Sequence, residues 1–281
     1  MKEGQASRTA ELVCMGRALA QLRRDVPRFS DPTARTLLSD EARARVDAAA
    51  RGDGQRLRDR IGAAYLERQA ALMIVRTVVI DDAVREAGHR QLVILGAGLD
   101  GRAWRMPELA GVTVFEVDHP DTQRVKKERL ASLTPTSSDI RFVAVDFTRD
   151  SLDAELARAG HDPKQPTTWI WEGVVMYLTP GDVEATLRVI AARSAKGSRL
   201  AANYHAFGLL YHVIGAAVRM LGEPLRSRYT PETWRRTVER AGFRVRSDES
   251  LAEAARAFGT SLAATVKPMT HLRIAIADRI E

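Results

Sequence analysis

The stretch "QLVILGAGLDGRAWRM", residues 91–106, decides the fold. It opens with a short apolar run, breaks into a glycine-rich turn and continues as a helical pattern, which is the strand–loop–helix order of a nucleotide-binding α/β unit. Gly96, Gly98 and Gly101 have the spacing of a dinucleotide-binding loop. Asp100 lies inside that loop, where a pyrophosphate would have to bind, so the spacing alone leaves the ligand open.

From residue 91 onward, strand-like and helix-like segments alternate. Five β-rich runs precede two more near the end of the chain, with a helical excursion at about 250–264 between the last two. The seven runs are 91–95, 112–118, 140–147, 167–173, 198–205, a strand after Gly242, and 270–279. This alternation predicts a Rossmann-like α/β fold with a mainly parallel seven-stranded sheet and helices on both faces.

The part before residue 91 has a helical pattern instead. Apolar positions recur at spacings of three and four after residue 7, the pair Asp31 and Pro32 has the form of an N-cap followed by proline at N1, and a third helix is expected at about 61–87. Gly88 is its expected end.

We therefore expect three parts in the chain. Residues 1–90 form a helical N-terminal extension that acts as a lid, residues 91–281 form the sheet domain, and an inserted helical cap lies at about 206–230. The 281 residues are 45% hydrophobic, which is ordinary for a globular protein with a buried core.

Composition narrows the function classes. The net charge of +7 comes from arginines that are interleaved with acids along the chain, which is typical of a solvated surface and not of a nucleic-acid face. No apolar stretch reaches membrane-spanning length, no secretory signal is expected, and the single cysteine, Cys14, can form no disulfide within the chain. We expect a cytoplasmic protein with a small-molecule partner, no nucleic acid and no membrane; its oligomeric state is unknown.

Three successive strands of the predicted sheet end in acids. The second ends in Glu116 and Asp118, the third in Asp146, and the fourth in Glu172. Each acid could cap the following helix. Ligands of open α/β sheets bind beyond the carboxyl ends of the strands, however, and the recurrence of acids at these ends favours a binding site.

The choice of ligand depends on charge. Asp118 follows the loop by about twenty residues, where a carboxylate binds a ribose diol in both dinucleotides and S-adenosylmethionine. Asp100 opposes a pyrophosphate, whereas S-adenosylmethionine carries a sulfonium and an ammonium group, with only its carboxylate needing a cation. Arg76 and Arg102 can supply that cation, and Glu172 can face the ammonium group. This polarity favours S-adenosylmethionine over NAD.

At these residues the chain resembles the class I S-adenosylmethionine-dependent methyltransferases of the leucine carboxyl methyltransferase family, and within it the bacterial tetracenomycin-polyketide-type O-methyltransferases. Three motifs carry the resemblance in this order: "LGAGLDGR" (95–102), "EVDHP" (116–120) and "EGVVMYL" (172–178). The family often has threonine at the position of Gly101. We expect this departure to loosen the loop locally without removing a donor contact.

The resemblance implies that seven residues hold S-adenosylmethionine. They are Arg76 at the methionine carboxylate, Gly96 and Gly98 in the donor loop, Asp118 at the ribose, Asp146 and Phe147 at the adenine, and Glu172 at the methionine end.

Methyl transfer from a sulfonium is an in-line displacement, so alignment of donor and acceptor can supply most of the catalysis, without a metal. A carboxylate acceptor needs no base, whereas a hydroxyl would benefit from one. The catalytic residue is unknown, and Tyr177, Tyr204 and His205 are candidates for the acceptor pocket that could equally be packed wall residues. The apolar helical pattern at 205–225 favours a small apolar or aromatic, polyketide-like acceptor.

Two other functions remain open at this point. The first is an NAD(P)-dependent oxidoreductase, which would have to tolerate Asp100 beside a pyrophosphate. The second is a noncatalytic binding protein that retains a methyltransferase fold.

Overall fold

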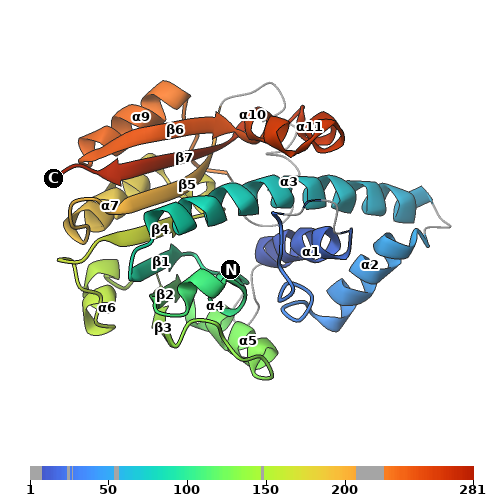
Figure 1. Cartoon of the computed structure of the whole chain (residues 1–281), viewed down its shortest axis with the longest axis horizontal. Helices are drawn as coiled ribbons and strands as arrows, with labels where there is room; N and C mark the ends of the chain where they lie inside the picture. The colour runs from blue at the N-terminus through green and yellow to red at the C-terminus, as the bar shows by residue number, and fades with distance from the viewer. Residues whose placement is uncertain (1–7, 24–25, 27, 54–56, 147–148, 207–224) are drawn as a thin grey trace.

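A seven-stranded sheet forms the centre of the molecule (Figure 1). The computed structural model describes the whole chain except residues 1–7, 24–25, 27, 54–56, 147–148 and 207–224. The strand order is β3-β2-β1-β4-β5-β7-β6, with β7 antiparallel to both neighbours and the remaining pairs parallel. The strands are β1 (Gln91–Leu95), β2 (Thr113–Asp118), β3 (Asp139–Ala144), β4 (Thr167–Trp171), β5 (Arg199–His205), β6 (Phe243–Ser250) and β7 (Leu272–Arg279). The predicted mainly parallel α/β sheet is confirmed.

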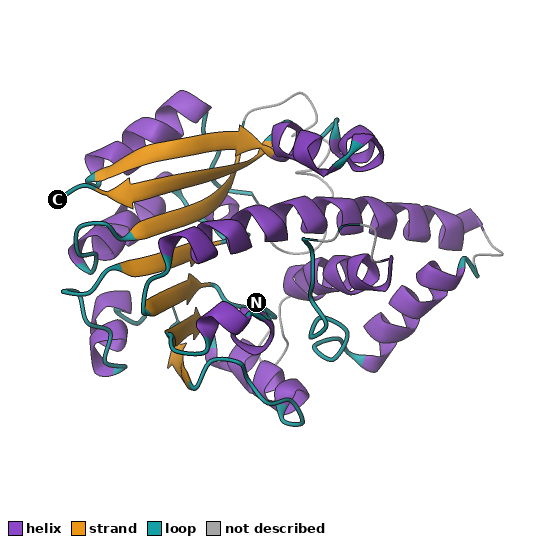
Figure 2. Cartoon of the chain, in the orientation of Figure 1, coloured by secondary structure: helices purple, strands orange, loops and turns teal. Residues whose placement is uncertain are grey.

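Helices cover both faces of the sheet (Figure 2). Along β1, Val93 and Leu95 belong to the core cluster packed under α6, α7 and α9, while Leu92 and Ile94 belong to the cluster under α3, α10 and α11. Parallel strands need this double cover because both of their faces are apolar. These helices are α3 (Leu57–Ala87), α6 (Leu152–Arg158), α7 (Pro180–Ala192), α9 (Pro231–Arg240), α10 (Leu251–Ala254) and α11 (Thr260–Val266).

The long helix α3 joins the N-terminal segment to the sheet. Its second half is buried against the sheet, and its first half extends beyond it beside α1 (Arg8–Arg23) and α2 (Asp40–Arg51) (Figure 1). The helix begins four residues before the expected position 61 and ends at Ala87, as predicted. The expected cap at 206–230 lies mostly within residues 207–224, outside the described part of the chain.

The pair Asp31 and Pro32 does not start a helix, which corrects the sequence interpretation. The Asp31 carboxylate does accept a hydrogen bond from the backbone N–H of Ala34 at 3.1 Å, as an N-cap would, but the chain continues as successive turns to residue 38. The next helix, α2, begins after Ser39, whose side chain accepts from the N–H of Ala42. Asp31 is fully buried and pairs with Arg17, so its carboxylate links its own segment to helix α1.

The glycine loop between β1 and α4 (Arg102–Arg105) needs glycine at two positions for backbone reasons. Gly96 and Gly98 have φ of +67° and +48°, a region that side chains with a Cβ disfavour. A Cβ on Gly96 would also overlap Val174. The loop therefore turns sharply beside the end of β4.

Gly101 is required by packing. Its φ of −109° suits any residue, but a Cβ there would overlap the Oγ1 of Thr33. Thr33 in turn donates a hydrogen bond to Asp31 at 2.6 Å. At the position of Gly101 the family often has a threonine, and here the side chain of Thr33 from the N-terminal segment occupies the space beside Gly101. This contact offsets the loosening of the loop that we expected from the glycine.

Gly101→Ala is accordingly expected to lose about 1–3 kcal/mol of unfolding free energy, the usual cost of overpacking a close contact. Urea denaturation measures this loss as a lower midpoint at unchanged m value. Adding Thr33→Ala should recover part of it by removing the overlapping hydroxyl. Gly111→Ala is the matched control, because a Cβ there meets nothing within 4 Å. Equal stability of the Gly101→Ala and Gly111→Ala proteins would contradict the packing role.

Candidate functional site

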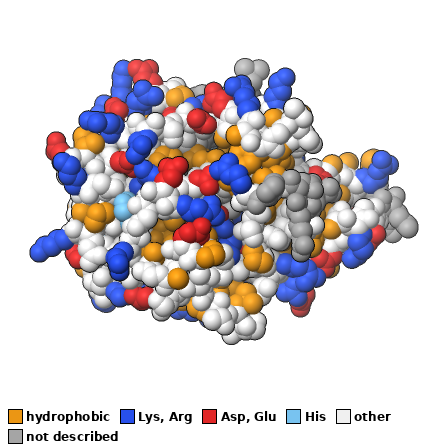
Figure 3. Space-filling model, viewed as in Figure 1, with side chains coloured by type: hydrophobic (Ala, Val, Ile, Leu, Met, Phe, Trp, Pro, Cys, Tyr) orange, Lys and Arg blue, Asp and Glu red, His pale blue; other side chains and the backbone are white. Residues whose placement is uncertain are grey.

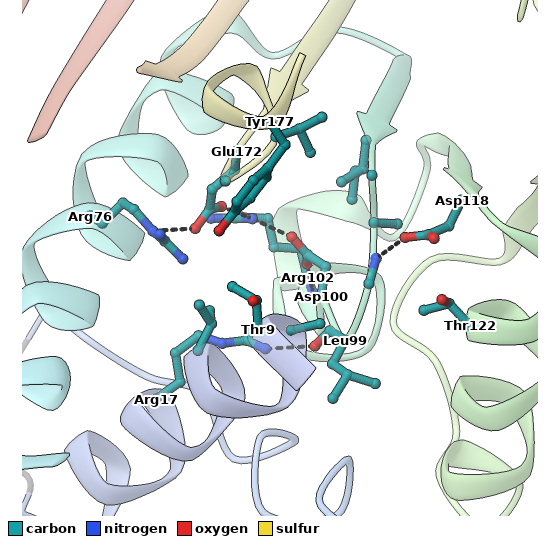
Figure 4. Close-up of a pocket in the computed structure, with 18 of the residues that line it drawn as sticks. Thr9, Arg17, Arg76, Leu99, Asp100, Arg102, Asp118, Thr122, Glu172 and Tyr177 are labelled. Atoms are coloured by element: carbon teal, nitrogen blue, oxygen red, sulfur yellow. Dashed lines mark hydrogen bonds and ion pairs between the residues drawn. The ribbon is translucent and has the colours of Figure 1, made fainter. Parts of the chain in front are cut away.

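A cavity of about 440 Å³ opens at the carboxyl ends of β1, β2 and β4 (Figure 4). Its wall includes the glycine loop, two of the strand-end acids, Asp118 and Glu172, residues of α1 and one arginine of α3. The cavity thus lies where parallel α/β sheets bind their ligands.

The structure brings most of the predicted donor residues together. Five of the seven line this cavity: Arg76, Gly96, Gly98, Asp118 and Glu172. Asp146 follows β3 but is absent from the described lining residues, and its backbone N–H donates to Asp150 at 2.8 Å. Phe147 lies outside the described residues. The roles assigned to these residues toward a donor stay predictions.

Asp118 connects the end of β2 to the glycine loop. Its Oδ2 accepts from the N–H of Gly98 at 2.5 Å and its Oδ1 accepts from the N–H of His119 at 2.6 Å. Burial raises the pKa of Asp118, and these two N–H groups offset only part of that rise. A carboxylate has about four acceptor positions, so both oxygens can still accept bonds from a diol.

Glu172 lies between two arginines at the other end of the cavity. Its Oε1 is 2.6 Å from Nε of Arg76, and its Oε2 is 2.8 Å from Nη1 of Arg102. Burial alone would raise the pKa of Glu172, but the two guanidinium groups hold it below its ordinary value. Figure 4 shows the Arg76 side chain reaching from α3 toward Glu172. This end of the cavity therefore presents both a cation and an ionised acid.

Asp100 and Arg102 lie at the end of the glycine loop and line the cavity. Asp100 accepts from the backbone N–H of Arg102 at 2.7 Å and forms an ion pair with its guanidinium, whose Nε also lies 2.7 Å from Asp81. Burial alone would raise the pKa of Asp100, but Arg102 is the first of several cations that hold it well below its usual range. Arg102 already forms ion pairs with three carboxylates and is only 2% exposed. Of the two cations considered for a ligand carboxylate, Arg76 is therefore the better placed.

Sequence reasoning missed Arg17. This residue of α1 also lines the cavity and is 6% exposed. One signal in the sequence could have found it. Arg17 lies between Cys14 and Ala18 on the apolar side of a helix, and a basic residue there is expected to pair with a buried acid or carbonyl. Thr9, Thr122 and Arg226 line the cavity as well and carried no spacing signal.

The three acceptor-pocket candidates separate in space. Tyr177 follows β4 and lines the cavity. Tyr204 is fully buried in the core, where its ring stacks on Trp234 with centroids 4.7 Å apart and its hydroxyl donates to Asp248 at 2.7 Å. That position matches the packing alternative considered for it.

His205 points to the opposite face from Tyr204, because successive strand residues alternate. Its ring meets that of His271 edge-on, with centroids 5.8 Å apart. Burial, His271 and Arg76 together lower the pKa of His205 to about 3. A histidine with this pKa is neutral near pH 7 and is a weak base. Neither His205 nor Tyr204 is among the described residues that line the cavity.

The surface shows charges of both signs. On the face drawn in Figure 3, Lys and Arg side chains are interspersed with Asp and Glu. Among the described residues, no group of three or more His, Cys, Asp or Glu side chains has a geometry that could hold a metal ion. None of the helices in the described ranges is both long enough and apolar enough to cross a membrane.

The fold of this chain resembles that of a solved structure. A solved structure of a "putative methyltransferase" from Thermobifida fusca YX matches this chain with a TM-score of 0.65, over 100% of this chain and 97% of that one, at 15% identity. At this identity the likeness concerns the fold, which is the Rossmann-like fold of the methyltransferases.

The family follows from the sequence comparison. Residues 10–191 match the family described as leucine carboxyl methyltransferase, and the chain belongs to it. A relative from Mycobacterium sp. (strain JLS) is 40% identical over 154 residues, which are 54% of this chain and 52% of that protein. Another, from Mycolicibacterium gilvum (strain PYR-GCK), is 38% identical over 226 residues, 78% of this chain and 71% of that protein. Both carry the name "Putative S-adenosyl-L-methionine-dependent methyltransferase". The chain spans about half the length of the first of these relatives.

Proposed function

We propose that this chain is an S-adenosylmethionine-dependent O-methyltransferase whose donor occupies the cavity at the ends of β1, β2 and β4. The observation that carries the proposal is the polarity of that cavity. A carboxylate, Asp118, stands at one end, and the pair of Arg76 and Glu172 stands at the other. A nucleoside with an amino-acid tail has the complementary polarity, since it offers a diol at one end and a carboxylate with an ammonium group at the other.

Each of these residues then has a defined task. Asp118 accepts hydrogen bonds from the ribose hydroxyls, Arg76 pairs with the methionine carboxylate, and Glu172 accepts from the ammonium group. S-adenosylmethionine supplies an activated methyl group when bound. Gly96 and Gly98 give the loop its turn beside the donor, because residues with a Cβ disfavour the positive φ found at both positions.

The acceptor is proposed to be a small apolar or aromatic molecule, of the kind methylated by tetracenomycin-polyketide-type O-methyltransferases, with a carboxylate or hydroxyl oxygen as nucleophile. The described carboxylates that line the cavity, Asp100, Asp118 and Glu172, all accept backbone hydrogen bonds or ion pairs. Asp118 and Glu172 are also assigned to the donor, and neighbouring cations hold the pKa of Asp100 well below its usual range. We therefore assign none of these three carboxylates as a base toward the acceptor, which favours an acceptor that is already an anion. A panel of aromatic carboxylic acids and matching phenols, read by methyl transfer from labelled donor, distinguishes the two.

We also propose that the N-terminal extension acts as a lid over the donor, since Thr9, Ala10, Val13 and Arg17 of α1 line the cavity. The chain is proposed to act in the cytoplasm on a small molecule.

The donor assignment is tested by Asp118→Ala. This change removes a charged acceptor of two ribose hydroxyls, and each such bond contributes roughly 1.5 kcal/mol or more, so the Kd for S-adenosylmethionine should rise about 100-fold in calorimetry. Asp139→Ala is the control, because Asp139 opens β3 and pairs with the half-exposed Arg141. Unchanged affinity in Asp118→Ala would refute the ribose contact.

Titration of the wild-type chain with S-adenosylmethionine and with NAD, together with the acceptor panel, distinguishes the other two functions. NAD binding by the wild-type chain without S-adenosylmethionine binding would indicate an oxidoreductase. Donor binding without turnover of any acceptor in the panel would indicate a noncatalytic binding protein.

A further inference from the structure

Arg17 joins the N-terminal helix to the glycine loop. Its Nη2 donates to the backbone carbonyl of Leu99 at 2.6 Å, and its Nη1 lies 2.9 Å from Oδ2 of Asp31. Figure 4 shows the side chain rising from α1 to the Leu99 carbonyl at the edge of the cavity. A single guanidinium thus holds a carboxylate of its own segment and a carbonyl of the loop.

Asp31 fixes the direction of that guanidinium. It is 0% exposed and accepts further hydrogen bonds from Thr33 Oγ1 at 2.6 Å and from the N–H of Ala34 at 3.1 Å. Arg105 approaches the same carboxylate at 3.8 Å and also donates to the carbonyl of Ser30 at 3.0 Å. Asp31 is therefore held from several sides and leaves Arg17 little freedom to turn away from the loop.

The contact with Arg17 adds to hydrogen bonds that the loop already has. The N–H of Asp100 donates to the carbonyl of Ala97 at 2.8 Å, and the N–H of Ala97 donates to the carbonyl of Val117 in β2 at 3.0 Å. Gly96 and Gly98 have wide conformational freedom, so contacts from neighbouring elements help to fix the shape of this turn. Asp118 fixes the N–H of Gly98 from the side of β2, and Arg17 fixes the carbonyl of the next residue from the side of α1.

We propose that Arg17 is a positioning residue of the donor site: through the Leu99 carbonyl it holds the glycine loop in the shape that binds S-adenosylmethionine, with Asp31 as its support. The inference rests on the proposed function. It makes α1 a part of the donor site and not only a cover for it.

The test compares Arg17→Met with the double variant Arg17→Met/Asp31→Asn. The single variant leaves the Asp31 charge buried without Arg17, so both stability and donor affinity should fall, with the Kd for S-adenosylmethionine raised about tenfold or more. The double variant removes both charges, so the free energy of unfolding should recover toward the wild-type value. The Kd should stay raised, because the Leu99 carbonyl still has no guanidinium.

Two further measurements sharpen the result. In Arg17→Lys the ammonium group can reach one of the two partners but cannot span both with a planar fork, so an intermediate Kd is expected. With an active acceptor, the KM for the donor should rise in Arg17→Met while kcat at saturating donor changes much less. Arg35→Met is the matched control, since Arg35 lies in the same segment and pairs with Asp47 at the surface, at 2.7 Å.

The outcomes separate the two proposals. Recovery of both stability and Kd in the double variant, or an unchanged Kd in Arg17→Met, would overturn the positioning role while leaving the donor site intact. Failure of the wild-type chain to bind S-adenosylmethionine would overturn the proposed function, and the positioning role with it.

Discussion

The Arg102→Met protein is expected to lose about 3–5 kcal/mol of unfolding free energy, the cost of removing one partner from a buried ion pair. Arg102 is 2% exposed and contacts Asp81, Asp100 and Glu172, so its loss leaves three carboxylates in the interior with fewer cations. Methionine keeps much of the volume, so the loss reports the missing charge. Urea denaturation at pH 7 measures it.

A surface arginine provides the comparison. Arg124 pairs with Glu128 at 3.1 Å, and both side chains are more than half exposed, so Arg124→Met should change stability by only about 0–1 kcal/mol. If Arg102→Met and Arg124→Met lost similar unfolding free energy, the buried ion pairs of Arg102 would contribute no more to stability than a surface pair.

The stability lost in Arg102→Met should also depend on pH. Burial opposes ionisation of Asp100 and Glu172, yet neighbouring cations, with Arg102 common to both, hold their pKa values below the ordinary 3.8 and 4.5. A lowered pKa in the folded state stabilises the fold above the unfolded-state pKa, and this contribution disappears as the pH falls through the folded-state pKa. The difference between wild type and variant should therefore be full at pH 7 and shrink below about pH 4.

Arg76→Met is expected to have the largest effect on donor binding. Arg76 is the cation proposed for the methionine carboxylate, and it also holds Glu172 at 2.6 Å in the orientation proposed for the ammonium group. Losing a buried, charge-assisted contact to the carboxylate together with the support of Glu172 should raise the Kd for S-adenosylmethionine by at least about 100-fold in calorimetry. Arg76→Lys keeps the charge without the planar fork and should recover only part of the affinity.

The control for this change lies on the same helix. Arg85 is more exposed and pairs with Asp82 and Glu108, away from the cavity lining, so Arg85→Met should leave the Kd unchanged. If Arg76→Met bound the donor as tightly as Arg85→Met, the carboxylate of the ligand would have to be held elsewhere.

The sequence predicted the sheet and most strand ends to within two residues, because these depend on local patterns. The exception is β3, which ends at Ala144, three residues before the expected end at 147. The alternation of strand and helix patterns, the β-branched runs and the glycine loop are each recognised from short stretches of sequence. The carboxyl ends of parallel strands must then meet at one edge of the sheet. Gly96, Asp118 and Glu172 were placed together on that basis, and they line one cavity. Asp146 followed the same rule but lies outside the lining of that cavity.

Local pattern was a poor guide where a side chain serves a distant partner. Asp31 has the form of a helix start, and its Oδ1 does accept from the N–H of Ala34, but the chain continues as turns and Oδ2 pairs with the distant Arg17. Tyr204 and His205 were both considered for one pocket, although strand alternation directs their side chains to opposite faces. Arg102 was considered as a free cation and is held by three acids.

The sequence by itself determined the Rossmann-like sheet, the glycine loop and the acids that surround the cavity, since backbone geometry and strand period act over short distances. Only the tertiary structure decided how the loop is held. Arg17 and Leu99 are 82 residues apart, and Thr33 fills the space beside Gly101 from another segment. Such contacts arise from burial and charge pairing between segments that pack together, and no local periodicity records which segment will supply the partner.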